Sequence, residues 1–108
     1  MTACRALPFA AALLLAACHR LGQSVTPTVT YTCSDGRQVQ AAYPDRDSAV
    51  LVLDGRSHRL RQAISADGAR YVGDGWQWWA KGLRQATLAP LKSGETIASA
   101  RGMDCRAR

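Results

Sequence analysis

Few residues in this chain have the types and spacing needed for catalysis. His58, one of two histidines, could be imagined in a triad with Ser65 and Asp54, the arrangement that activates a serine nucleophile. No nucleophile elbow, glycine-rich phosphate loop or metal-ligand spacing accompanies it. Asp45 and Asp47 alone are common in a turn, whereas metal sites need clustered ligands. We therefore expect His58 to be a partly exposed strand residue, and we expect no enzymatic activity, no metal and no cofactor.

Groups suited to recognition gather instead in residues 65–82. This stretch holds a turn signal at Asp67-Gly68 and a single lysine, Lys81, directly after an aromatic cluster. Asp and Gly both support a chain reversal. We expect residues 65–71 to form a presented loop, and residues 76–82 to form a packed strand that fixes the direction of Lys81.

All three tryptophans belong to that aromatic cluster. In a strand over residues 76–80, Trp76 and Trp78 share one face and Trp79 lies on the other. One of these faces is expected to be in the core, and Trp79 is either part of it or a rim aromatic. Tyr71 is expected either to brace the loop or to touch a partner.

The elements that must position these residues are short strands. Turn signals recur along the chain, including Asp35-Gly36 and the strong hairpin signal Asp54-Gly55. No stretch keeps a helical apolar period over more than two turns. Eight or so strands at this spacing favour an all-β antiparallel barrel or sandwich in one domain, residues 29–108. The expected strands are 28–33, 38–43, 49–53, 57–61, 69–72, 76–80, 84–88, and a closing segment of 96–100 plus 103–105.

The first residues predict an export signal. Residues 1–17 contain one early charge, Arg5, followed by an apolar run of signal-peptide length. That run is too short to predict a transmembrane helix. Leu15-Ala16-Ala17-Cys18 resembles the lipobox of bacterial lipoproteins, in which the signal is cut before a cysteine that becomes lipidated. The alternative is a plain secretory signal that happens to end beside a cysteine.

The lipobox resemblance implies a membrane-anchored protein. Cys18 would carry diacylglycerol, its amino group would be acylated, as with palmitate, and residues 18–28 would form a flexible tether. Because His19 is not aspartate, the analogy with such lipoproteins points to the outer membrane, with the domain facing the periplasm. In an exported chain, the remaining pair Cys33 and Cys105 predicts one disulfide.

The chain is basic, with 14 Lys and Arg against 8 Asp and Glu. A basic balance suggests an acidic partner without choosing one. An arginine face is one candidate for an acidic ligand such as anionic lipid, glycan or nucleic acid, and a barrel with aromatics would suit single strands. An address outside the cytoplasm argues against nucleic acid. The arginines that could share this face are Arg56, Arg59, Arg61 and Arg70.

The stretch Ser65-x-Asp67-Gly68-x-x-Tyr71, followed by Trp79-Ala80-Lys81-Gly82, resembles the signature of the MliC/PliC family. These are membrane-bound and periplasmic inhibitors of c-type lysozyme in Gram-negative bacteria. The resemblance runs from about Tyr31 to Cys105, and the lipobox suits the membrane-bound branch. It implies an eight-stranded antiparallel barrel.

The resemblance also implies a mechanism and a partner, c-type lysozyme. The family loop enters the lysozyme cleft together with the lysine, so the residues expected to contact lysozyme are Ser65, Asp67, Gly68, Tyr71, Lys81 and Gly82. Lysozyme uses two carboxylates, and an ammonium beside them would pair with their charge. No covalent step is required.

This chain departs from the family pattern at two positions. Asp67 stands where the family has serine, and Ala80 stands where it has threonine. A carboxylate at position 67 would repel the target's carboxylates unless one of them is protonated or Lys81 lies between them. Ser65 could supply the hydroxyl group instead.

Overall fold

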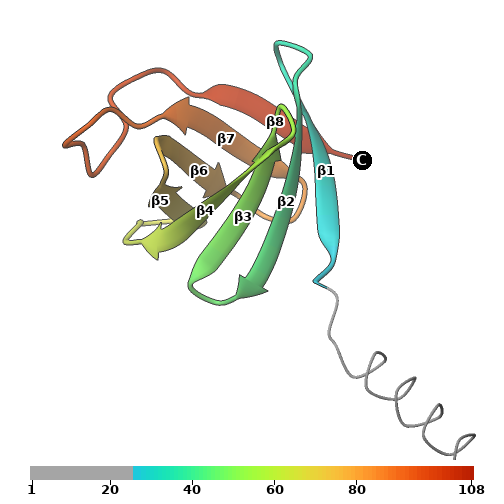
Figure 1. Cartoon of the computed structure of the whole chain (residues 1–108), viewed down its shortest axis with the longest axis horizontal. Coiled ribbons are helices and arrows are strands. Elements are labelled where there is room, and N and C mark those ends of the chain that lie inside the picture. The colour runs from blue at the N-terminus through green and yellow to red at the C-terminus, as the bar shows by residue number, and fades with distance from the viewer. Residues whose placement is uncertain (1–25) are drawn as a thin grey trace, which may run out of the picture.

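Residues 26–108 are described by a computed structural model, in which eight antiparallel strands close into a barrel (Figure 1). Each strand pairs with the next, and β8 returns to β1. This all-β barrel confirms the predicted fold class. The predicted signal peptide, Cys18 and most of the tether lie outside the described residues. The strands are β1 (Thr28–Cys33), β2 (Gln38–Asp45), β3 (Ser48–Leu53), β4 (Arg56–Ala63), β5 (Ala69–Gly73), β6 (Trp76–Ala80), β7 (Gln85–Pro90) and β8 (Met103–Ala107).

Alternating side chains fill the barrel. Along β3, every second residue is buried, as expected for a strand with one face toward a core. Trp78 is fully buried and meets Tyr31 edge to face, with ring centroids 4.9 Å apart. Trp76 is partly buried against the same core, whereas Trp79 lies on the outer face. The predicted division of the tryptophans between two faces is therefore confirmed, and Trp79 is the rim aromatic.

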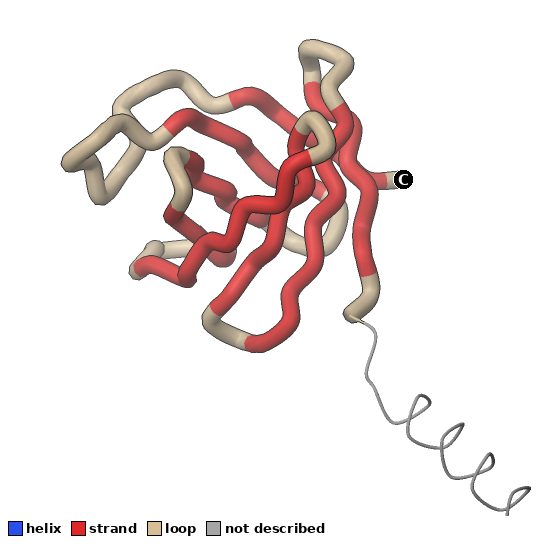
Figure 2. Tube along the Cα trace, in the orientation of Figure 1, coloured by secondary structure: helices blue, strands red, loops and turns tan. Residues whose placement is uncertain are grey.

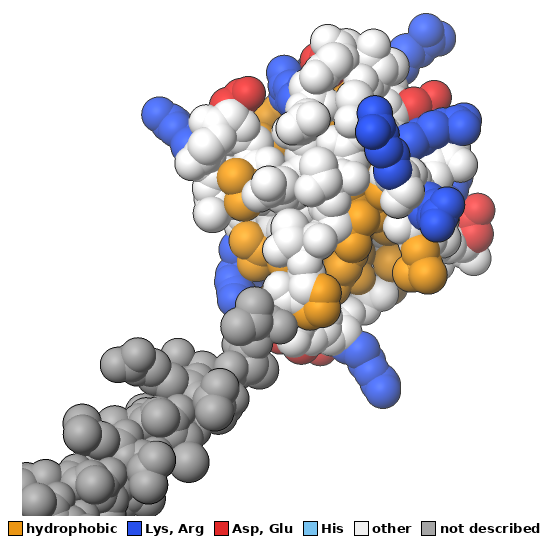
Figure 3. All heavy atoms as spheres, turned by 90° about the vertical axis from the view of Figure 1, so that its right-hand side faces the viewer, with side chains coloured by type: hydrophobic (Ala, Val, Ile, Leu, Met, Phe, Trp, Pro, Cys, Tyr) orange, Lys and Arg blue, Asp and Glu red, His pale blue; other side chains and the backbone are white. Residues whose placement is uncertain are grey.

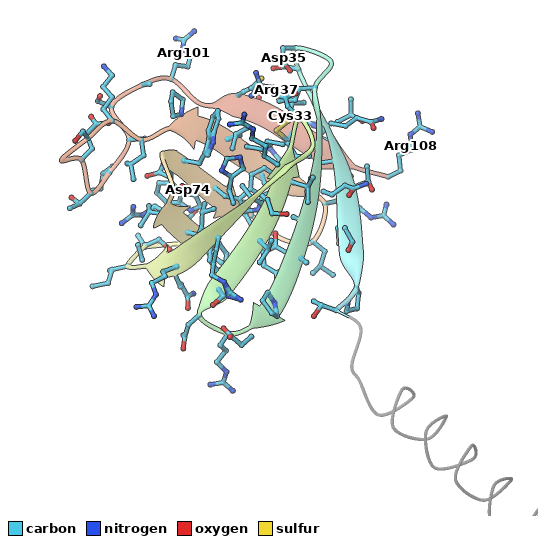
Figure 4. The ribbon with its side chains drawn as sticks, in the orientation of Figure 1. Cys33, Asp35, Arg37, Asp74, Arg101 and Arg108 are labelled. Carbon is cyan, nitrogen blue, oxygen red and sulfur yellow. A yellow bond between two sulfur atoms is a disulfide. The ribbon has the colours of Figure 1, made fainter. Side chains whose placement is uncertain are left out.

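The predicted disulfide is present and joins the two ends of the domain. Cys33 and Cys105 lie opposite each other in the β1–β8 pairing, and both are buried. Figure 4 labels Cys33 close to the β1–β2 turn. The bond therefore reinforces the seam at which the first strand meets the last.

Turn chemistry sets the hairpins as the sequence predicted. Asp54 and Gly55 form the two-residue β3–β4 turn with φ of 50° and 78°, the left-handed pair that such turns require. Because all neighbours are antiparallel, the β2–β3, β4–β5 and β6–β7 connections lie at one end of the barrel. We call this the lower end, following its place in Figure 1.

One predicted strand is wrong. Residues 96–100 form no strand; they belong to the long β7–β8 loop, residues 91–102, drawn in tan in Figure 2. Every strand of the closed barrel already has two partners, so no strand edge is left to pair with these residues. The loop folds over the outer face of β5 and β6, where Ala98 donates its N–H to Gln77 Oε1 at 3.0 Å. Within residues 26–108, no helix has the length and apolar character to cross a membrane.

Candidate functional site

Two loops at the lower end lie against each other. Ala69 pairs with Ala80 at the end of the β5–β6 ladder, so the β4–β5 loop, residues 64–68, continues directly beside the β6–β7 loop, residues 81–84. Gly68 has φ of +64°, and a Cβ placed there would lie 2.5 Å from the Ala80 carbonyl oxygen. Glycine is needed both for the backbone conformation and for this close approach.

A charged pair is displayed where the loops meet. The Asp67 carboxylate lies 3.9 Å from Lys81 Nζ, and their side chains are 70% and 51% exposed. Trp79 lies between the two loops: its Nε1 donates to the Asp67 carbonyl oxygen at 2.9 Å, and its ring centroid is 5.1 Å from Lys81 Nζ. An exposed ion pair at this distance is weak, so both groups remain free to contact a partner.

Other predicted site residues shape the two loops. Ser65 donates its hydroxyl to the Gly68 carbonyl oxygen at 3.2 Å, which closes the β4–β5 loop on itself. Gly82 has φ of +79°, and the Lys81 N–H donates to the Gln85 carbonyl oxygen at 2.8 Å across the β6–β7 turn. The structure thus brings five of the six predicted contact residues together on the exposed loops.

Tyr71 is placed differently, because its side chain points into the barrel. It is only 6% exposed and packs against Tyr43 with ring centroids 5.6 Å apart. Burial, with a smaller contribution from Tyr43, raises the pKa of its phenol. Tyr71 also lines an apolar hollow of about 400 Å³ at the lower mouth of the barrel, which Leu83 borders. Tyr71 therefore lies in the barrel mouth beneath Gly82 and Leu83 rather than on the exposed loops.

Arg70 is a positioning residue that the sequence analysis missed. It was expected on an exposed arginine face, but it is 6% exposed, so this expectation is wrong. Its guanidinium donates to the Ile64 carbonyl oxygen at 2.8 and 3.1 Å, to the Thr96 carbonyl oxygen at 2.9 Å and to Gln77 Oε1 at 3.3 Å. It therefore fixes the start of the β4–β5 loop.

The other three arginines of the expected face lie on one strand. Arg56, Arg59 and Arg61 are exposed on β4, while Figure 3, which views the side toward β1, shows basic side chains dispersed around a hydrophobic area. Three of the four expected arginines therefore share one exposed strand, and the buried Arg70 is not part of their surface.

The imagined catalytic triad does not form. His58 Nδ1 lies 2.6 Å from the carboxylate of Asp74. Asp74, labelled in Figure 4, belongs to the β5–β6 turn. That turn is at the opposite end of the barrel from Ser65. No group of three metal-binding side chains occurs among residues 26–108.

Large apolar side chains flank the charged pair. Ile64 and Leu83 are 94% and 88% exposed, and they stand in the two loops that carry Asp67 and Lys81. Large apolar side chains exposed together beside polar groups are typical of a surface that binds another protein. Their exposure was not predicted, because apolar residues in short loops carry no signal of their own exposure.

The fold and the site thus define a small disulfide-joined barrel that displays a fixed loop and a lysine at one end. Residues 31–96 match the family described as membrane-bound lysozyme-inhibitor of c-type lysozyme, and the chain belongs to this family. The predicted resemblance is therefore confirmed.

Two relatives and one solved structure show how far the similarity extends. The membrane-bound lysozyme inhibitor of C-type lysozyme from Cupriavidus necator is 36% identical, with 74% of this chain and 65% of that protein covered. The Pseudomonas aeruginosa protein of the same name is 30% identical, with 77% and 66% covered. The chain thus spans just under two thirds of these relatives. A crystal structure of Pseudomonas aeruginosa MliC in complex with hen egg white lysozyme is 30% identical, with a TM-score of 0.53 over 78% of this chain and 83% of that chain.

Proposed function

We propose that this protein inhibits c-type lysozyme by inserting the β4–β5 loop and Lys81 into the active cleft. The observation that carries the proposal is the fixed pairing of the two loops around Trp79, with Lys81 exposed at their junction. The solved complex of a family member with hen egg white lysozyme supports the choice of partner.

The chemistry of the target suits these groups. Lysozyme cleaves its substrate with two carboxyl groups on either side of the scissile bond. An ammonium held at the junction of two rigid loops would pair with that negative charge as the cleft loses water, and charge-assisted hydrogen bonds are the stronger kind. The protein would block the substrate site without reacting, so it has no catalytic residue.

The contact surface would consist of polar groups with an apolar border. Lys81, Asp67, Ser65 and the backbone at Gly68 and Gly82 would enter the cleft. The exposed side chains Ile64 and Leu83 would cover its rims and exclude water around the ion pairs, as the near-neutral ring around an interface hot spot does. Tyr71 would act from beneath, by holding the loop.

An inhibition assay tests the proposal. The purified protein is titrated into hen egg white lysozyme acting on bacterial cell walls, and Lys81→Ala is compared with Lys92→Ala. Lys92 is the other lysine of the mature chain and lies in the β7–β8 loop, at the opposite end of the barrel. We expect inhibition to weaken by about a hundredfold in Lys81→Ala, since losing a buried charge partner costs roughly 2–5 kcal/mol, and to be unchanged in Lys92→Ala.

The loop is tested separately with glycine variants. Gly68→Ala must displace the Ala80 carbonyl, whereas Gly36→Ala, also at positive φ, has nothing within 4 Å of the added Cβ. We expect Gly68→Ala alone to lose inhibition. If Gly68→Ala and Lys81→Ala each inhibit lysozyme as strongly as the unchanged protein does, the proposed mode of insertion is ruled out.

We propose further that the protein is anchored in the outer membrane by lipid on Cys18, facing the periplasm. The support is the Leu15-Ala16-Ala17-Cys18 sequence and the membrane-bound relatives. Cys18→Ser should move the protein from the membrane fraction to the soluble fraction, while Cys4→Ser should not. A membrane fraction unaffected by Cys18→Ser would contradict the anchor.

A further inference from the structure

Asp67 and Lys81 form one presented unit with two opposite charges. The backbone of Asp67 is held by Trp79 Nε1 at 2.9 Å, and Lys81 is held at its N–H by the Gln85 carbonyl at 2.8 Å. Both side chains remain exposed, with 3.9 Å between carboxylate and ammonium. A partner that meets the tip of the loops therefore meets a hydrogen-bond acceptor and a donor side by side.

The charged groups that face Asp67 come from two other elements. Lys81 belongs to the β6–β7 loop. Arg70 of β5 lies on the same Trp79 ring, with Cζ 5.9 Å from the ring centroid, but its guanidinium hydrogens are used by the carbonyl oxygens of Ile64 and Thr96. Lys81 is thus the cation that can move with Asp67 into a partner's cleft.

The two carboxyl groups of lysozyme are not equivalent. An apolar pocket raises the pKa of the general acid to about 6, while its neighbour stays ionised in a polar environment. Below that pH, the cleft presents one O–H donor and one carboxylate. A carboxylate and an ammonium side by side are the complement of this arrangement.

On the basis of the function proposed above, we infer that Asp67 makes binding depend on whether the general acid of lysozyme is protonated. The Asp67 carboxylate accepts a hydrogen bond from the protonated general acid, while Lys81 pairs with the ionised carboxylate beside it. Hydrogen bonds of the O–H···O⁻ type are short and strong. When the general acid is ionised, the same Asp67 carboxylate repels it. Asp67 therefore makes the inhibitor selective for the acid-protonated enzyme.

A pH dependence follows from proton linkage. Binding raises the pKa of the lysozyme acid, so affinity is complete below the acid's free pKa and falls as pH rises above it. The affinity falls by at most about tenfold per pH unit, and one proton is then taken up on binding. A serine or asparagine side chain at position 67 can donate as well as accept, so binding would then lose this dependence.

Calorimetric titration of hen egg white lysozyme with the purified protein tests the inference. Kd is measured from pH 5 to 8, and proton uptake is obtained from pairs of buffers that differ in ionisation enthalpy. We expect the affinity of the unchanged protein to fall about fiftyfold between pH 6 and pH 8, with nearly one proton taken up at pH 8. Asp67→Asn and Asp67→Ser should bind with a flat profile and no uptake.

Asp35→Asn is the matched control. Asp35 is also an exposed carboxylate beside a cation, 3.7 Å from Arg37, but Figure 4 places both at the β1–β2 turn, at the opposite end of the barrel. This variant should keep the full pH profile.

The outcomes separate this inference from the function on which it rests. Binding that does not change with pH and takes up no proton overturns the role of Asp67 and leaves lysozyme inhibition standing. If Asp67→Ser binds more tightly than the unchanged protein by the same factor at every pH, the role of Asp67 is also overturned and lysozyme inhibition still stands. Asp67 would then act only by holding Lys81 back from its partner. No binding at any pH, by the unchanged protein or by Asp67→Ser, overturns both.

Discussion

Trp79 contacts both loops of the site, residues 64–68 and residues 81–84. Its Nε1 fixes the Asp67 carbonyl and its ring lies beneath Lys81. Trp79→Phe keeps a ring and removes the donor, and a hydrogen bond contributes about 1 kcal/mol net. We expect the free energy of unfolding to fall by about 1 kcal/mol or less, and inhibition of lysozyme to weaken by up to about fivefold because the loop must then be ordered on binding. Trp76→Phe, away from the site, is the control, and equal inhibition by both variants would contradict the role of Trp79.

Tyr43 gives the stability of the barrel a dependence on alkaline pH. Its hydroxyl oxygen accepts a hydrogen bond from Trp78 Nε1 at 2.9 Å, and burial, the largest effect, raises the pKa of the phenol. The folded state holds this phenol proton more tightly than the unfolded state does. The contribution of Tyr43 to the free energy of unfolding is therefore complete below about pH 10 and is lost as pH rises above it.

Tyr43→Phe tests this assignment by urea denaturation at two pH values. At pH 7 the variant should lose about 1 kcal/mol or slightly more, because Trp78 Nε1 is left without its buried acceptor. Between pH 9 and pH 11 it should lose less stability than the unchanged protein. If the variant loses as much stability as the unchanged protein over this range, folding does not raise the pKa of Tyr43.

At the scale of elements, Arg70 ties three segments together. Its guanidinium reaches from β5 to the start of the β4–β5 loop at Ile64 and to the β7–β8 loop at Thr96. Arg70→Met leaves these carbonyl oxygens without donors, at a cost of about 2 kcal/mol. Arg59→Met, on the exposed face of β4, should change stability by no more than about 0.5 kcal/mol. Equal midpoints of urea denaturation for the two variants would contradict the anchoring role.

The strands were predictable because their signals are local. The Asp54-Gly55 turn needs left-handed backbone that those residue types accept, and the alternation in β3 follows from one buried face. The covering of β5 and β6 by residues 91–102 was not predictable. It depends on Arg70 and Gln77 meeting backbone groups some 20 or more positions away, and no local pattern specifies such contacts.

The site was predictable to the same extent. The motif identified the loop and Lys81, and the possibility that Lys81 lies between Asp67 and the carboxylates of lysozyme was raised from their charges alone. The sequence could not decide between the two roles of Tyr71, since a tyrosine next to a loop faces inward or outward according to the register of β5 with β6. The exposure of Ile64 and Leu83 likewise depends on how far each loop projects.

At the scale of the whole molecule, closure of the barrel depends on one seam. β1 and β8 share three residue pairs in register, and one of them is the disulfide pair Cys33 and Cys105. The bond spans a sequence separation of 72 residues, for which the loss of chain entropy in the unfolded state amounts to about 4 kcal/mol. The Cys33→Ala and Cys105→Ala double variant should lose about that much stability in urea denaturation. A loss below about 1 kcal/mol would mean that strand pairing alone closes the barrel.

Insertion into the cleft, the central claim, is tested most directly by competition with a saccharide. Hen egg white lysozyme is titrated with the protein by calorimetry, with and without a trimer of N-acetylglucosamine that occupies the cleft. If residues 64–68 and Lys81 fill the same space, the apparent Kd of the protein rises in proportion to the saccharide concentration. A Kd that stays constant at saturating saccharide would show that the protein binds lysozyme elsewhere, and would contradict the account.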